Sequence, residues 1–294
     1  MASLGRVLAE RMRFVPAPAL GTIPTLTDRD MATIVRLVYE KSGIALHGGK
    51  RALVTARLQK LLRRSGFTTF REYLRFLESD KSGAELTAML DAIATNHTAF
   101  FREPQHFDFL ARVVLPALRE RAEFEPISAW SAACSSGEEP YTIAMTAFEQ
   151  FGDQTRRLIR VLASDLSTKA LMRAAAGVYK TERVEGIPRH LVVKYFDKHA
   201  VQPGTIRISE AVRRVVEFHQ INLLDGAPRG RGFDVIFCRN VLIYFDRLVQ
   251  QRVVSRLEER LARGGYLFTS HSESLNGLRH GLTWVAPAVY RRDH

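Results

Sequence analysis

Cysteine is scarce in this chain: Cys134 and Cys238 are the only two among 294 residues. Two cysteines cannot build a disulfide framework, so the sequence excludes a disulfide-stapled fold and predicts a reducing compartment, the cytoplasm. Long apolar stretches are also lacking, and without a run of about 18 apolar residues no segment is predicted to span a membrane. Arg6, Glu10 and Arg11 interrupt the start of the chain, which therefore lacks the continuous apolar region of a signal peptide.

Acidic residues are the second shortage. The chain has 31 Asp and Glu against 43 Lys and Arg, a formal net charge of +12. No acidic residue occurs between Glu40 and Glu72, whereas the basic residues there are Lys41, Lys50, Arg51, Arg57, Lys60, Arg63, Arg64 and Arg71. Such a stretch favours an anionic partner, which could be a nucleic acid, an acidic lipid surface or an acidic protein. The plainer interpretation is a solvated face with surplus arginine.

The composition is otherwise that of a globular protein, with 46% hydrophobic and 25% charged residues. Residues 1–26 are rich in Ala and Pro and are predicted to form a flexible leader. Residues 27–95 are predicted to form a small all-α domain, because apolar residues recur there at helical spacing and no strand pattern occurs. Thr27, with Asp30 three residues later, is the expected cap of the first helix, and Gly66 is the expected end of the second.

The pattern changes from residue 96. Residues 96–126 are predicted to be a linker and a connecting helix that begins at Pro104. Residues 127–294 are predicted to form an α/β domain, because short apolar runs alternate with helical stretches, which implies a mostly parallel sheet covered by helices on both faces. The expected strands are Ile127–Ser131, Leu158–Ser164, Phe233–Cys238 and Tyr266–Ser270, and the expected helices are 140–151, 167–176 and 246–263. Two further runs, Thr205–Ile208 and Val215–His219, are predicted as strands of a small antiparallel insert at about 199–219.

Residues beyond the carboxyl ends of the strands are site candidates, because ligands bind there in open α/β sheets. The first strand is followed by Ser-Ala-Ala-Cys-Ser-Ser-Gly-Glu-Glu-Pro-Tyr at 131–141, whose small residues allow close backbone approach. Glu138 and Glu139 would repel a phosphate and favour a ligand with a cationic centre. Asp165 follows the second strand, where a carboxylate can accept hydrogen bonds from both hydroxyls of a ribose. Together these residues predict an adenosine-bearing cofactor.

Other candidates flank these loops. Asn222 and Leu223 follow the insert and could flank an adenine ring, and Arg239, Asn240 and Tyr244 follow a buried strand. A segment with two aromatic residues and several polar ones, at 94–104, could complete the site from the linker. The spacing of His and Cys matches no metal motif, and no nucleophile elbow occurs, so no metal is expected.

Taken together, these segments resemble one family, the chemotaxis receptor methyltransferases (CheR). The resemblance covers residues 28–292 and rests on an ordered set of segments. These are Asn-x-Thr-x-Phe-Phe-Arg-Glu at 96–103, Ser-Gly-Glu-Glu-Pro-Tyr at 136–141, Ala-Ser-Asp at 163–165, Asn-Leu-Leu at 222–224 and Phe-Cys-Arg-Asn-Val-x-Ile-Tyr-Phe at 237–245. A departure occurs in the last segment, where Ser270 replaces the family's Gly before His271-Ser272-Glu273.

The resemblance implies a Rossmann-like class I methyltransferase sheet. It also implies methyl transfer from S-adenosylmethionine to glutamate side chains of methyl-accepting chemotaxis proteins, with S-adenosylhomocysteine as product. By the same resemblance, the residues in contact with the cofactor are Asn96, Thr98, Arg102, Glu138, Asp165, Asn222, Leu223, Arg239 and Asn240. Arg102 and Tyr244 are the expected catalytic residues, near the transferring methyl.

The resemblance further implies that the basic helix docks on the receptor's cytoplasmic domain, an acidic helical bundle. The expected docking residues are Arg51, Arg57, Lys60, Arg63 and Arg64. In some members the β insert binds a tether peptide at the receptor C-terminus through a Gly-rich turn, but Pro203-Gly204 supplies one glycine here, so tethering is not expected. A cytoplasmic monomer that is recruited to membrane receptor arrays without inserting into the membrane is expected.

Two alternatives from other classes stay open. A nucleic-acid methyltransferase would suit the charge, although enzymes that methylate base amino groups usually carry Asn/Asp-Pro-Pro-aromatic where this chain has Arg-Asn-Val-Leu-Ile-Tyr. A non-catalytic adaptor could bind the cofactor only as a sensor. The presence of Arg102, Asp165 and Tyr244 argues against the adaptor.

Overall fold

The computed structural model describes residues 24–46, 48–80, 83–93, 97–197 and 202–293. The chain forms two compact units: Met1–Leu37 with His47–Ile93, and Val38–Leu46 with Ala94–His294. Most of the predicted leader and Asn96 lie outside the described residues.

The first unit is helical, as predicted. Its elements are α2 (Asp28–Ser42), whose last turns from Val38 group with the second unit, η1 (Gly48–Lys50), α3 (Arg51–Ser65), α4 (Phe70–Ser79) and α5 (Ala84–Ile93). The cap of α2 is confirmed: the Thr27 hydroxyl accepts the Asp30 N–H at 3.2 Å and donates to the Asp30 carboxylate at 2.6 Å. Gly66 ends α3 in the left-handed conformation, with φ of 77°.

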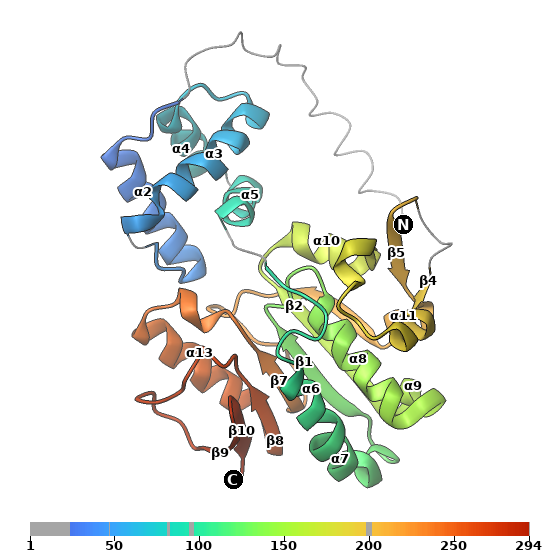
Figure 1. The fold of residues 1–294 in the computed structure, drawn as a ribbon. Helices are drawn as coiled ribbons and strands as arrows, with labels where there is room; N and C mark the ends of the chain where they lie inside the picture. The colour runs from blue at the N-terminus through green and yellow to red at the C-terminus, as the bar shows by residue number, and fades with distance from the viewer. Residues whose placement is uncertain (1–23, 47, 81–82, 94–96, 198–201, 294) are drawn as a thin grey trace. The chain divides into compact units, whose positions relative to one another are not determined.

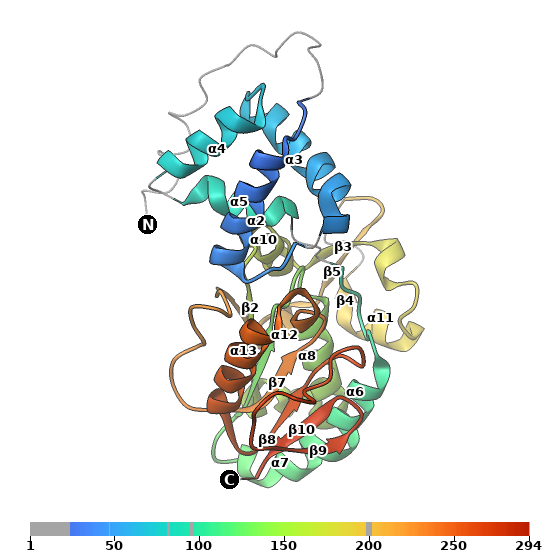
Figure 2. The same ribbon diagram turned by 90° about the vertical axis from the view of Figure 1, so that its left-hand side faces the viewer.

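The second unit is built on a seven-stranded sheet of order β6-β2-β1-β7-β8-β10-β9 (Figures 1 and 2). Its parallel strands are β6 (Val216–Gln220), β2 (Ile159–Asp165), β1 (Ile127–Ala132), β7 (Phe233–Cys238) and β8 (Leu261–Phe268). Two antiparallel strands that the sequence did not predict, β10 (Val289–Arg292) and β9 (Leu282–Ala286), complete the other end. The four predicted sheet strands are confirmed within a few residues, except that β8 begins at Leu261, inside the predicted helix.

Helices cover both faces of this sheet, as predicted, and alternate residues of its strands face two separate cores. On one face Val235 and Phe237 pack against α6 (Pro104–Phe109), π-helix η2 (Leu110–Val114), α7 (Leu115–Ala122) and α8 (Glu138–Phe151). On the other face Ile236 and Cys238 pack against α13 (Arg247–Arg260). This alternation gives the central strands two buried faces, which is why their sequences are mostly apolar on both faces.

The predicted place of Val215–His219 is wrong. The residues form β6, which pairs in parallel with β2 at the edge of the main sheet, with Ala163 opposite Phe218. Glu217 and His219 alternate with apolar residues in this strand, and such alternation is equally typical of a half-exposed edge strand and of a small antiparallel sheet. The spacing of side chains therefore could not assign the strand to one sheet or the other.

The insert begins earlier than the predicted residue 199. It is a three-stranded antiparallel sheet of order β3-β5-β4, from β3 (Val178–Lys180), β4 (Phe196–Asp197) and β5 (Thr205–Ile208). The 3₁₀ helix η4 (Thr181–Val184) and α11 (Arg189–Tyr195) join β3 to β4, and α12 (Glu210–Arg213) follows β5. Strands of two or three residues are too short to leave a recognisable pattern, so only β5 was predicted. Over the described part of the chain, no helix is both long and apolar enough to cross a membrane.

Candidate functional site

The carboxyl ends of β6, β2, β1 and β7 lie at one edge of the sheet, because these four strands are neighbours and run parallel. The loops that leave this edge carry most of the predicted site residues: Asn222 and Leu223 after β6, Asp165 at the end of β2, Glu138 after β1, and Arg239, Asn240 and Tyr244 after β7. Because β6 belongs to the main sheet, Asn222 lies at the same edge as the other candidates.

The loop after β1 turns sharply before α8. Ala133 has φ of 60°, Ser135 has φ of 51° and Gly137 has φ of 94°, all in the region that favours glycine. A Cβ atom added at Gly137 would lie 2.8 Å from the Cβ of Ala174, so this position has no room for a side chain. A backbone bent in this way presents its amides and carbonyls closely to whatever occupies the edge of the sheet.

Asp165 anchors this loop. Its Oδ2 accepts the Ser135 N–H and its Oδ1 accepts the Ser167 N–H, each at 2.8 Å, and the residue is 8% exposed. Ser167 is also the predicted N-cap of α10 (Thr168–Ala176), since its hydroxyl accepts the Ala170 N–H at 3.0 Å. Asp165 therefore fixes the loop after β1 and the start of α10 at the same time.

Glu138 lies in the first turn of α8 and is 1% exposed. Its Oε1 is paired with Nη2 of Arg183, and its Oε2 accepts the Ser136 hydroxyl at 2.7 Å. The same Nη2 of Arg183 donates to the carbonyl oxygen of Thr98 at 2.9 Å. Arg183 belongs to η4 of the insert, 45 residues from Glu138, and sequence reasoning missed it.

Arg102 lies in a strained stretch of the linker. Phe101 and Glu103, on either side of it, have φ values of 52° and 57°, which are uncommon for residues with side chains. The Phe101 N–H donates to the Thr142 hydroxyl at 3.3 Å, and Nη1 of Arg102 donates to the His97 carbonyl at 2.9 Å. These hydrogen bonds hold the strained backbone in place and so fix the position of Arg102.

Arg239 is buried among protein acceptors at the end of β7. Its side chain is 2% exposed, pairs with Glu139 Oε2 at 3.0 Å and Glu103 Oε2 at 3.1 Å, and donates to the carbonyl oxygen of Arg102. The guanidinium lies 5.6 Å from the ring centre of Phe107. Arg239 therefore ties the end of β7 to α8 and to the linker, and these contacts hold the backbone of Arg102.

The pKa values of the two carboxylates that pair with Arg239 shift in opposite directions. Burial raises the pKa of Glu139 although Arg239 opposes it. Burial also acts to raise the pKa of Glu103, but the charge and hydrogen bond of Arg239 outweigh it and hold this pKa below its ordinary value. One guanidinium thus compensates two carboxylates unequally, in line with the deeper burial of Glu139.

Asn240 is held by Glu273, a second residue that sequence reasoning missed. With φ of 59°, Asn240 adopts the left-handed conformation, and its N–H donates to Glu273 Oε2 at 2.8 Å. Its side-chain amide donates to the Ser270 hydroxyl at 2.8 Å. The Glu273 carboxylate also accepts the Ser270 N–H at 3.0 Å, and burial raises its pKa. The segment in which Ser270 departs from the family pattern therefore supports the loop after β7.

Asn222, Leu223 and Tyr244 are placed as follows. The Asn222 amide donates to the Lys41 carbonyl and to Asp225, and Leu223 is buried against Trp130 in the core under α13. Tyr244 ends the 3₁₀ helix η5 (Leu242–Tyr244), is half-buried, and accepts the Ala45 N–H at its carbonyl oxygen at 2.8 Å. Leu223 is thus a core residue, and the side chain of Asn222 links the loop after β6 to the end of α2.

Among the described residues, Glu103, His106 and His271 form a group that could hold a metal ion. Nδ1 of each histidine lies 3.4 Å from Glu103 Oε2. The two rings are stacked, with centres 4.6 Å apart and an angle of 28° between planes, and Arg239 contacts the same carboxylate oxygen. Because the rings of His106 and His271 are stacked, their nitrogen lone pairs lie in nearly parallel planes and do not converge as tetrahedral coordination requires. The guanidinium of Arg239 would also repel a cation bound to Glu103.

The predicted docking residues of α3 divide into two groups. Arg51 pairs with Asp28 and Arg57 donates to the Ile93 carbonyl, so both stabilise the helical unit itself. Lys60, Arg63 and Arg64 are exposed, and no acidic residue occurs in the helix. Because 60, 63 and 64 are three and four positions apart, these three side chains share one face of α3. We call Lys60, Arg63 and Arg64 the α3 basic face.

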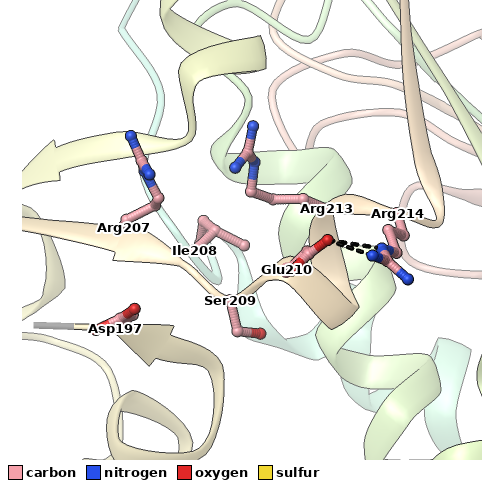
Figure 3. A pocket seen from close by; sticks show the side chains of 7 residues that line it. All are labelled: Asp197, Arg207, Ile208, Ser209, Glu210, Arg213 and Arg214. Atoms are coloured by element: carbon pink, nitrogen blue, oxygen red, sulfur yellow. Dashed lines mark hydrogen bonds and ion pairs between the residues drawn. The ribbon is translucent and has the colours of Figure 1, made fainter. Parts of the chain in front are cut away.

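The insert contains a polar cavity of about 400 Å³ (Figure 3), lined by Asp197, Arg207, Ile208, Ser209, Glu210, Arg213 and Arg214. Glu210 pairs with Arg214, as the dashed lines in Figure 3 show, and Arg213 donates to the Ala175 carbonyl at 3.2 Å. Nε of Arg207 and the hydroxyl of Ser209 are buried and make no hydrogen bond with the described residues. This cavity lies on strand β5 and helix α12, apart from the loops at the edge of the main sheet.

Two family descriptions match the chain: "CheR methyltransferase, SAM binding domain" over residues 96–289, and "CheR methyltransferase, all-alpha domain" over residues 29–94. The chain is 37% identical to a chemotaxis protein methyltransferase of Borreliella burgdorferi, over 91% of this chain and 95% of that protein. It is 38% identical to a protein of the same name from Escherichia coli, over 90% and 91%. It is also 38% identical to chemotaxis protein methyltransferase 2 of Pseudomonas aeruginosa, over 94% and 97%.

Proposed function

Because the chain belongs to the CheR methyltransferase family, we propose that it transfers a methyl group from S-adenosylmethionine to glutamate side chains of methyl-accepting chemotaxis receptors. The observation that carries this proposal is the set of acidic groups at the edge of the parallel sheet. Asp165 is buried at the end of β2 and Glu138 is buried after β1, where a tight loop separates them.

These acceptor groups fit S-adenosylmethionine. The two hydroxyls of a ribose need an acceptor such as Asp165, and the ammonium group of the methionine part needs an anion such as Glu138. The hydroxyl of Ser135 is buried without a partner among the described residues, which leaves polar capacity beside Asp165. Thr98, Asn222, Asn240 and, outside the described residues, Asn96 are proposed as further contacts. Leu223 would contact the adenine ring. Arg239 would act by positioning the loops, since its nitrogens contact Glu103, Glu139 and Arg102.

The chemistry needs no general base on the protein. The acceptor is a carboxylate with an ordinary pKa of about 4.3, so it is ionised at neutral pH. The bound cofactor supplies an electrophilic methyl group on a positively charged sulfur. The task of the chain is to hold the acceptor in line, and such orientation can lower a barrier by about 7–11 kcal/mol. We assign Arg102 to the acceptor carboxylate, whose charge needs a partner once water is excluded, and Tyr244 to a hydrogen bond at the reacting centre.

The receptor is proposed to dock directly on the α3 basic face. The family resemblance implies that the receptor's signalling domain is an acidic helical bundle. Several exposed cations that act together would bind it with an affinity that falls as the salt concentration rises. The turn before β5 has a single glycine, Gly204, in place of the Gly-rich turn that binds a tether peptide in some members, which supports docking without a C-terminal tether. The protein would then act as a monomer in the cytoplasm, recruited to receptor arrays at the membrane.

Labelled S-adenosylmethionine tests the function. The chain is incubated with a receptor signalling domain that has or lacks its C-terminal extension, and separately with DNA and with RNA. We expect label on both receptor forms at similar rates, and loss of that label in alkali, because a carboxyl methyl ester is base-labile. Label on nucleic acid would establish the rival methyltransferase class, and cofactor binding without any transfer would establish the adaptor.

A further inference from the structure

We propose that Arg183 of the insert is a positioning residue of the cofactor site, which fixes the Glu138 carboxylate for the amino-acid end of S-adenosylmethionine. The inference rests on the proposed function and adds to it a residue outside the predicted site. It also makes the small antiparallel sheet a part of the cofactor site, since η4 follows directly on β3.

The first argument is burial. Glu138 has a side chain 1% exposed, whereas the side chain of Arg183 is 40% exposed. The pair therefore differs from the surface ion pair of Arg214 and Glu210, whose side chains are 63% and 71% exposed. A carboxylate buried to this degree needs a fixed cationic partner, because losing the partner leaves an uncompensated charge.

The second argument is geometry. Arg183 occupies Oε1 of Glu138, while Oε2 accepts the Ser136 hydroxyl, which can rotate, and no other donor among the described residues. The guanidinium thus sets the orientation of the carboxylate and leaves Oε2 with acceptor capacity for an ammonium group. The same nitrogen of Arg183 donates to the Thr98 carbonyl, so one side chain connects Glu138 with the linker that carries Arg102.

The third argument is that the insert is anchored on both sides of Arg183. The Tyr179 hydroxyl, on β3, donates to the Ser136 carbonyl at 2.7 Å, which joins the insert to the loop after β1. The ring of Phe100, in the linker, packs edge-on against Tyr179 with centres 5.0 Å apart and against Phe196 at 5.4 Å. These contacts restrict where η4 can lie and therefore restrict Arg183.

The test uses two ligands that differ in the amino-acid end, whose ammonium group Glu138 would contact. S-adenosylhomocysteine carries the amino-acid end, and 5′-methylthioadenosine lacks it. For Arg183→Gln in the full chain, calorimetry should give at least a tenfold loss of affinity for S-adenosylhomocysteine and less than a twofold change for 5′-methylthioadenosine. Arg183→Lys should recover part of the loss, and the KM for the cofactor should rise while kcat at saturation changes less than threefold.

Two further variants sharpen the result. Lys180→Gln removes the same charge from an exposed neighbour in β3 and should bind both ligands as the wild type does. Glu138→Gln should lose affinity for S-adenosylhomocysteine, and adding Arg183→Gln to it should cause little further loss, because both act on the same end of the ligand.

Three results would overturn the inference while leaving the proposed function intact: unchanged affinity in Arg183→Gln, equal weakening of both ligands, or tighter binding of S-adenosylhomocysteine. Tighter binding would mean that Arg183 competes with the ligand's ammonium group instead of orienting its partner. If the wild-type chain bound neither ligand, the proposed function would fail together with the inference.

Discussion

Arginine serves in two opposite environments in this chain. In the second unit Arg239 is buried, and it is surrounded by two carboxylates, a carbonyl oxygen and an aromatic ring. In the first unit, the α3 basic face (Lys60, Arg63 and Arg64) is exposed, and its helix contains no acidic residue. The charge in the first arrangement is compensated inside the protein, whereas the charge in the second is exposed to solvent.

The difference explains what the net charge of +12 can and cannot indicate. Buried cations such as Arg239 are matched by buried anions and contribute local order. Only the exposed cations produce a field that an anionic partner can sense. A surplus of basic residues therefore predicts a partner, but it does not locate the site of chemistry.

The largest effect is expected from removing the buried cation. Arg239→Met leaves Glu139 and Glu103 without their counter-charge, and breaking a buried pair in this way costs about 3–5 kcal/mol. Unfolding in urea measures the change. The double variant Arg239→Met with Glu139→Gln should be more stable than the single variant, since one unpaired carboxylate is gone. Equal stability of Arg239→Met and the wild type would refute the buried network.

Arg102 lies between the two extremes, half-buried and in a strained loop. Arg102→Ala should reduce turnover about 100-fold, equivalent to about 2.7 kcal/mol of barrier, with the fold retained. The reason is the loss of the cation proposed to hold the acceptor carboxylate. Methyl transfer at saturating cofactor, checked by circular dichroism for folding, measures it. A wild-type rate would remove Arg102 from the mechanism.

The exposed cations should give a smaller and salt-dependent effect. Reversing the α3 basic face, with Lys60, Arg63 and Arg64 changed to Glu, should lower kcat/KM for the receptor about tenfold, because individual surface pairs contribute about 1 kcal/mol or less. Binding of S-adenosylhomocysteine should not change. The matched control reverses three exposed arginines of the second unit, Arg112, Arg156 and Arg263. If the control lowered receptor methylation equally, general charge and not this face would be responsible.

The smallest effect concerns pH. Burial lowers the pKa of His106 to about 4, so between pH 6.5 and 4 the unfolded chain binds a proton that the folded chain does not. The contribution of His106 to the free energy of unfolding is therefore fully present above pH 6.5, and it is lost as the pH falls from 6.5 to about 4. From pH 7.5 to 5.5 the loss should be about 1 kcal/mol. His106→Gln should show a shallower fall in urea unfolding, whereas the α3 variant should follow the wild type.

Local features of the fold were predictable from the sequence because local physics determines them. The capping of α2 by Thr27, the end of α3 at Gly66 and the central strand Phe233–Cys238 depend on residues a few positions apart. So does the position of Asp165 at a strand end. The family resemblance then supplied roles that no spacing could supply, and the cofactor contacts and catalytic roles among them stay predictions.

The missed features depend on distant residues. Arg183 contacts Glu138 across 45 residues, and Glu103 contacts the backbone of His271 across 168. Membership of β6 in the main sheet depends on pairing with β2, since its own alternation suits either sheet. Arg239 is the instructive case, because the sequence placed it at the right edge but could not reveal that three protein acceptors already surround it.

The division of the chain has a consequence for how the enzyme can be cut. The two units alternate along the sequence: the Val38–Leu46 segment of the second unit lies between the two parts of the helical unit, Met1–Leu37 and His47–Ile93. In that segment Ala45 bonds the backbone of Tyr244, Ile44 bridges to Phe245, and the Tyr39 hydroxyl donates to Asp246 at 2.5 Å. A fragment that starts at the linker would lose all three supports of the loop that carries Tyr244. The two units are therefore interleaved along the polypeptide, so no single cleavage separates them, and a cut at the linker damages the larger one.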